Sequence, residues 1–160
     1  MDPAQNVRGL YFIEEVEEIK YIPVAVLLFY LSYLDFKKRE VPDSAVLALF
    51  IYSLLTCRNF KESFLTAVTV FLLLLIPSII FEGSIGGGDI KLLTALAFFM
   101  GKDFSILALP MFILLVATLI YGLIKRKGLK YSVPLVPYVF VSYLFYFYLE
   151  VFLWNFHFSY

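Results

Sequence analysis

Two aspartates in a strongly apolar chain are the residues best suited to chemistry. Asp89 follows three consecutive glycines at the start of an apolar segment, and Asp35 ends an earlier apolar segment. Ionisable side chains at membrane depth are energetically costly, so each one is a candidate functional residue. Two carboxyl groups a few ångströms apart cannot both ionise cheaply, and the pair therefore shares one proton. Such a pair can activate water and polarise a peptide carbonyl, which predicts an aspartyl protease.

The helix ends predict different charge states for the two carboxyl groups. Asp89 opens a helix, whose positive end favours an anion, whereas Asp35 closes one, whose negative end favours the protonated form. Nearby cations could weaken or reverse this preference, namely Lys37, Lys38, Arg39 and Lys91. For Asp35 alone, the competing interpretation is a solvated helix-end residue paired with a lysine.

The glycines before Asp89 are candidate substrate contacts. Gly86, Gly87 and Gly88 carry no side chains, so an extended peptide backbone can approach them closely. Lys91 and Glu82, on either side of the glycines, are further candidates for contacts with substrate residues. The competing interpretation is a flexible turn followed by a helix that Asp89 caps.

Composition excludes several classes of protein. The chain has 160 residues, of which 62% are hydrophobic, with 18 Phe and 12 Tyr. Its net charge is zero, which argues against a nucleic-acid partner. One cysteine, Cys57, and one histidine, His157, argue against a disulfide framework and a metal site. We therefore expect neither a metal nor a cofactor.

Apolar segments predict an all-α integral membrane protein, because a bilayer offers backbone groups no hydrogen-bond partners outside helices and closed barrels. Residues 21–160 would form one domain of six transmembrane helices, and residues 1–20 a tail or an amphipathic interfacial helix. The glutamate-rich start argues against a cleavable signal peptide. The expected helices are Tyr21–Leu34, Ser44–Cys57, Phe64–Phe81, Ile90–Met100, Phe104–Ile124 and Val133–Phe156.

The distribution of basic residues predicts the orientation in a cytoplasmic membrane. Seven lysines and arginines follow the first and fifth segments, at 37–39 and 125–130, against five in the opposite loops. The excess of positive charge marks the cytoplasmic side, so the N-terminus would lie outside. The end of the first helix and the start of the fourth would then both face the cytoplasm, together with both aspartates.

Two motifs resemble those of the type IV prepilin peptidase family, including its archaeal preflagellin-peptidase branch. Members carry an aspartate followed after five residues by Ile/Val-Pro-Asn/Asp, and here Asp35 precedes Val41-Pro42-Asp43. Their second motif is Gly-x-Gly-Asp-x-Lys-Leu, which matches Gly86 to Leu92. Gly101 matches the glycine that closes the following helix, and residues 133–138 resemble the proline-rich start of the last helix.

The resemblance implies a function and a substrate class. Asp35 and Asp89 would be the catalytic pair of a membrane aspartyl endopeptidase that removes the short basic leader of class III signal peptides, from pilin, flagellin or related precursors. Larger members also N-methylate the new terminus through a cysteine-containing domain, which we do not expect in this chain. The alternative is a non-catalytic membrane carrier or a scaffold for pilus or secretion assembly.

Overall fold

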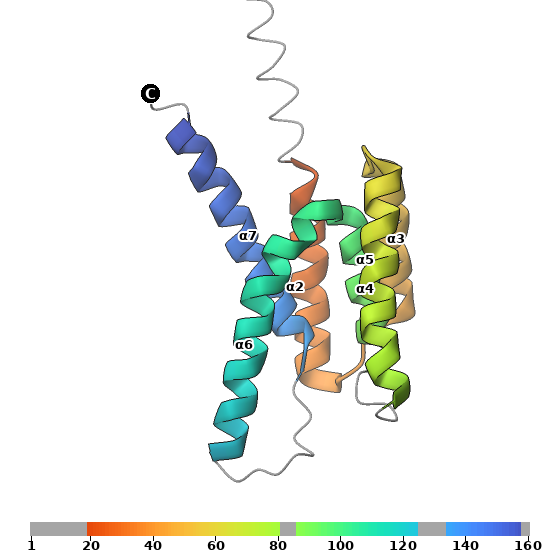
Figure 1. Ribbon diagram of the computed structural model, residues 1–160, viewed down its shortest axis with the longest axis vertical. Helices are drawn as coiled ribbons and strands as arrows, with labels where there is room; N and C mark the ends of the chain where they lie inside the picture. The colour runs from red at the N-terminus through yellow and green to blue at the C-terminus, as the bar shows by residue number, and fades with distance from the viewer. Residues whose placement is uncertain (1–18, 81–85, 125–133, 158–160) are drawn as a thin grey trace, which may run out of the picture.

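Six α-helices and one short 3-10 helix form the part of the chain that the computed structural model describes, residues 19–80, 86–124 and 134–157. No strand occurs in these residues, so the predicted all-helical class is confirmed. Figure 1 shows their arrangement, with neighbouring long helices running in opposite directions. The elements are α2 (Tyr21–Lys38), α3 (Asp43–Thr56), α4 (Phe60–Ile80), α5 (Gly87–Met100), η1 (Gly101–Asp103), α6 (Phe104–Ile124) and α7 (Val136–His157).

The helices follow the apolar segments of the sequence, with small differences at their starts and ends. α2 continues beyond its predicted end, Leu34, to Lys38. α4 begins at Phe60 rather than at the predicted Phe64, because its first turn contains the charged residues Lys61 and Glu62, which an apolar pattern does not include. Two stretches, Phe60–Ile80 and Gly87–Thr118, are long and apolar enough to cross a membrane by length and composition. Membrane crossing by all six helices remains a prediction, and the expected N-terminal tail or interfacial helix lies almost entirely outside the described residues.

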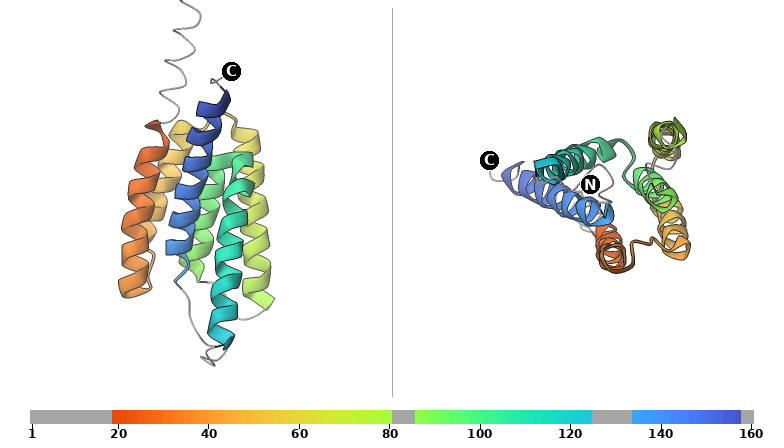
Figure 2. Two further views of the ribbon diagram at one scale, coloured as in Figure 1. Left: turned by 90° about the vertical axis from the view of Figure 1, so that its left-hand side faces the viewer. Right: turned by 90° about the horizontal axis from the view of Figure 1, so that it is seen from below.

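The helices form two groups. In one group α5 packs against both α3 and α4, and in the other α7 packs against both α2 and α6. The right-hand view of Figure 2 shows the two groups beside each other. They are connected by the short link between α2 and α3 and by η1 between α5 and α6. One group therefore carries Asp35, on α2, and the other carries Asp89, on α5.

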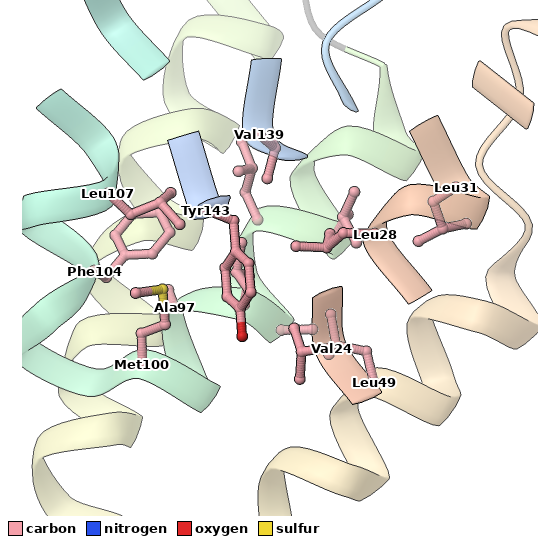
Figure 3. Packing of buried hydrophobic residues seen from close by; sticks show 14 of the residues in the cluster. Val24, Leu28, Leu31, Leu49, Ala97, Met100, Phe104, Leu107, Val139 and Tyr143 are labelled. Carbon is pink, nitrogen blue, oxygen red and sulfur yellow. The ribbon is translucent and has the colours of Figure 1, made fainter. Parts of the chain in front are cut away.

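Tyr143 of α7 lies at the centre of the hydrophobic core. Figure 3 shows its ring between Leu28 of α2 on one side and Leu107 of α6 on the other. All three side chains are fully buried. The Tyr143 hydroxyl donates a 3.0 Å hydrogen bond to the backbone oxygen of Tyr21, which satisfies its polar atom inside the core. This bond and the surrounding packing fix α7 against α2.

The outward faces of the helices remain apolar. Large hydrophobic side chains are exposed along several helices, including Val26, Phe29, Leu65, Leu73 and Leu109. A continuous apolar exterior of this kind marks an interaction or membrane surface rather than a water-facing one. The exterior therefore fits the bilayer environment predicted from composition.

Gly101 ends α5, as the sequence predicts. Its φ angle is +58°, a conformation that glycine adopts without strain. Its N–H bonds to the backbone oxygen of Ala97, and a Cβ at this position would lie 3.4 Å from Ser63 Oγ. The turn that follows, η1, reverses the chain into α6 at the end of the bundle opposite Asp89.

Candidate active site

Asp35 is buried in the last turn of α2. Only 6% of its surface is exposed, and no other charged residue among the described ones is classed as buried. Its carboxylate Oδ2 accepts a 3.0 Å hydrogen bond from the backbone N–H of Val136, the first residue of α7. The interpretation of Asp35 as a solvated residue paired with lysine is therefore wrong, because Asp35 is buried and bonded to backbone.

The start of α7 also changes the predicted charge asymmetry. In the sequence, Asp35 lies at the C-terminal, negative end of α2. In the structure its carboxylate also meets the N-terminus of α7, where the dipole has the opposite sign. The simple contrast between a helix start at Asp89 and a helix end at Asp35 therefore does not hold.

Asp89 lies in the first turn of α5, half-buried, directly after the glycines. Its carboxyl group is close enough to that of Asp35 for the two to interact electrostatically. The end of α2 and the start of α5 lie toward the same end of the bundle, the lower end in Figure 1. Helices from the two groups thus bring together two carboxyl groups that are 54 positions apart in the sequence.

The three glycines have different surroundings. A Cβ at Gly88 would lie 3.1 Å from Val41 Cβ, so only glycine lets the start of α5 approach the α2–α3 link this closely. A Cβ at Gly86 would lie 3.2 Å from Asp89 Oδ2. A Cβ at Gly87 would meet nothing within 4 Å. Gly88 therefore has a packing role, whereas Gly87 borders open space.

A cavity of about 430 Å³ and a larger one of about 790 Å³ lie near the start of α5. The larger cavity lies between the end of α2, the start of α3 and the three glycines. Leu34 and Gly88, the residues before the two aspartates, line it, whereas the aspartates themselves do not. Its charged lining has both signs, with Lys38, Arg39, Glu40 and Asp43 among its residues.

Lys91, a predicted substrate contact, is an ion-pair partner of Asp43. The Lys91 Nζ to Asp43 Oδ1 distance is 2.8 Å, and both side chains are largely exposed. Asp43 is the first residue of α3 and makes no capping bond to it, so its carboxylate links α3 to α5 instead. The Lys91–Asp43 ion pair is thus a second contact between the two sequence motifs, in addition to the close approach of Gly88 to Val41. Glu82, the other predicted contact, lies outside the described residues.

Sequence reasoning missed two features that the structure explains. The Val136 amide bonds Asp35, and the only sequence signal nearby was the pair of prolines at 134 and 137. Glu150, which interrupts the aromatic stretch of α7, interacts with Tyr146 one turn earlier. Glu150 is thus part of a tyrosine cluster in the half of α7 that is far from Asp35.

Comparison with known sequences finds one protein family. The sequence model of the type IV leader peptidase family matches residues 22–125, about two thirds of the chain. The matched range runs from α2 to the end of α6 and contains both aspartates, the α2–α3 link and the glycines. No curated protein and no solved structure matches the chain.

Proposed function

The chain belongs to the type IV leader peptidase family, and from this premise we propose that it is a membrane aspartyl endopeptidase with Asp35 and Asp89 as its catalytic pair. The single observation that carries the proposal is that the buried Asp35 of one helix group and the half-buried Asp89 of the other lie at the same end of the bundle, near enough for their charges to interact. A pair of carboxyls with one shared proton is the minimum that peptide hydrolysis requires without a metal or a covalent nucleophile.

The pair acts on one water and one peptide bond. The ionised carboxyl takes a proton from the water, whose oxygen attacks the scissile carbonyl carbon. The protonated carboxyl donates to the carbonyl oxygen as negative charge develops there. When the tetrahedral intermediate collapses, one of its two hydroxyl groups returns a proton to the ionised carboxyl, the other carboxyl gives its proton to the leaving nitrogen, and the C–N bond breaks. The pair thereby returns to its one-proton state.

The proposed substrates are precursors with class III signal peptides, such as those of pilins or flagellins. Their short leader would occupy the 790 Å³ cavity, where Glu40 is an acidic partner for a basic leader residue, although Lys38 and Arg39 also line the cavity and Asp43 is paired with Lys91. The hydrophobic helix that follows the leader would remain in the bilayer beside the enzyme. This arrangement presents the scissile bond at the membrane surface, next to the glycines.

A cleavage assay tests the proposed function directly. We expect the purified protein in detergent or liposomes to shorten a prepilin or preflagellin precursor by its leader, as measured by mass spectrometry. The new N-terminus is expected to carry no added methyl group in the presence of S-adenosylmethionine. A precursor with its basic leader residues changed to glutamate is the matched control. Intact precursor after prolonged incubation across a panel of leaders would contradict the proposal and favour a scaffold.

The proposed orientation places the aspartates on the cytoplasmic side and the N-terminus outside. Lys37 is exposed near Asp35, and Lys102 is exposed in η1 at the opposite end of the bundle. In a Cys57→Ser background, we expect a membrane-impermeant maleimide added outside intact cells to label Lys102→Cys and spare Lys37→Cys. Inside-out vesicles are expected to reverse this pattern. Labelling of Lys37→Cys from outside would overturn the orientation and leave the catalytic proposal to be tested separately.

A further inference from the structure

The bond between α7 and Asp35 adds a residue to the site that the family match does not include. We propose that the Val136 N–H positions the carboxyl group of Asp35 for catalysis, by holding Oδ2 as an acceptor and leaving Oδ1 to exchange the proton. Val136 lies beyond the matched range of residues 22–125. The inference rests on the proposed function, because it assigns a role in that reaction to α7.

The first turn of α7 has a single backbone donor available for Asp35. The Tyr138 and Val139 N–H groups both bond to the backbone oxygen of Leu135. Pro137 has no N–H. Among residues 136–139, Val136 is therefore the one whose N–H has its acceptor outside the helix, and that acceptor is Asp35 Oδ2. A helix start normally bonds a side chain close in sequence, whereas here the acceptor is 101 residues away.

The packing around this bond leaves little freedom to either partner. Val136 and Val139 are fully buried on α7, and Leu31, one turn before Asp35, is fully buried on α2. α2 and α7 pack directly against each other. Close-packed interiors resist small displacements, so the packing sets the position of the amide relative to the carboxyl group. The bond then selects the orientation of the carboxyl group about its last side-chain torsion.

A fixed orientation matters because catalytic rates fall steeply when reacting groups are misplaced by about 1 Å. With Oδ2 bonded to the amide, Oδ1 is the oxygen that takes a proton from water or gives one to the substrate. A carboxyl group without this bond could rotate and present either oxygen. Loss of the amide is therefore expected to slow the chemical step and to leave precursor binding nearly unchanged.

The test separates the amide from the side chain of residue 136. Val136→Pro removes the N–H and is compatible with the first position of a helix. Val136→Ala keeps the N–H but opens a cavity where a fully buried side chain stood. We expect Val136→Pro to lower kcat by about 10- to 100-fold with KM within about twofold. We expect Val136→Ala, which keeps the N–H, to lower the melting temperature and to lose clearly less kcat than Val136→Pro.

A second variant guards against misfolding of the proline protein. Replacing Val136 with its α-hydroxy acid keeps the side chain and exchanges only the N–H for an oxygen. We expect the same loss of kcat in this ester variant, in a protein that remains folded and helical by circular dichroism. A wild-type kcat in the folded ester or proline variant would overturn the proposal. Equal losses of kcat in the alanine and ester variants would also overturn it, because they would indicate general destabilisation.

Amide exchange tests the bond without any substrate. The Val136 amide is expected to exchange slowly with deuterium in the wild type and at least about tenfold faster in Asp35→Ala, with the Val139 amide as an internal control. Fast exchange in the wild type would overturn the positioning role. If no precursor is cleaved by the wild type but the amide is protected by Asp35, the proposed function fails while the structural link stands.

Discussion

Replacement of either aspartate by asparagine is expected to abolish leader cleavage, lowering kcat by at least about a thousand-fold. Asparagine has nearly the same shape as aspartate but can neither take a proton from water nor give one to the substrate. Losing a positioned acid or base typically slows an enzyme about a hundred- to ten-thousand-fold, and here one group of a two-group site is lost. Single-turnover cleavage of a labelled precursor measures the chemical step directly, and KM is expected to change by less than about threefold.

The asparagine variants are expected to fold, which makes the activity loss interpretable. In Asp35→Asn the side-chain carbonyl oxygen can still accept the hydrogen bond that Val136 N–H donates to Asp35 Oδ2. Asp103→Asn is the matched control, because Asp103 lies in η1 at the opposite end of the bundle. This control is expected to cleave at the wild-type rate. Cleavage by Asp35→Asn or Asp89→Asn at a rate near that of the control would show that the aspartyl mechanism is wrong.

Gly88→Ala is expected to lower kcat by about tenfold and to destabilise the fold moderately. The new Cβ would lie 3.1 Å from Val41 Cβ and 3.5 Å from the Val41 backbone oxygen, so Val41 or the start of α5 must shift by a few tenths of an ångström. Asp89 is the next residue, and a shift there changes its separation from Asp35. Small misplacements of reacting groups have large effects on rate. Cleavage kinetics and thermal unfolding of the purified variant measure the two effects.

Gly87→Ala is the matched variant for the structural part of this prediction. A Cβ at Gly87 would meet no atom within 4 Å, so the melting temperature is expected to stay within about 1 °C of wild type. Its KM is expected to rise, since the open space beside Gly87 belongs to the cavity proposed for the leader. If Gly88→Ala proves as stable and as active as wild type, the close approach of α5 to Val41 has no role in catalysis.

Much of the fold follows from local properties of the sequence. Long apolar segments form helices because their backbone groups must pair internally when no water is present, and the six observed helices lie on the six predicted segments. The discrepancies arise at polar first and last turns, such as residues 60–63 of α4 and 35–38 of α2, where hydropathy gives no signal. Gly101 was predicted as a helix end from its match to the family motif, and its positive φ angle gives the physical reason.

Partners within the site were much less predictable. Lys91 was expected to contact substrate, and its pairing with Asp43 depends on how α3 and α5 pack together. The three glycines at 86–88 are the same residue type, and they differ only in the atoms that lie near each of them in the fold. Spacing along the chain carries no information about such distances, because they arise from loops and helices that meet only in the folded protein.

The sequence by itself determined the all-helical architecture and singled out Asp35 and Asp89, since a charge in an apolar chain is energetically costly and so draws attention without a structure. Only the tertiary structure decided that Asp35 is buried, that its carboxyl group interacts with that of Asp89, and that Val136 donates to it. The reason is physical. The sequence shows which side chains can carry a charge, but it does not distinguish one backbone N–H from another, because every residue except proline has one. Which one of these donors reaches Asp35 is set by the packing of α7 against α2 across 101 residues of chain.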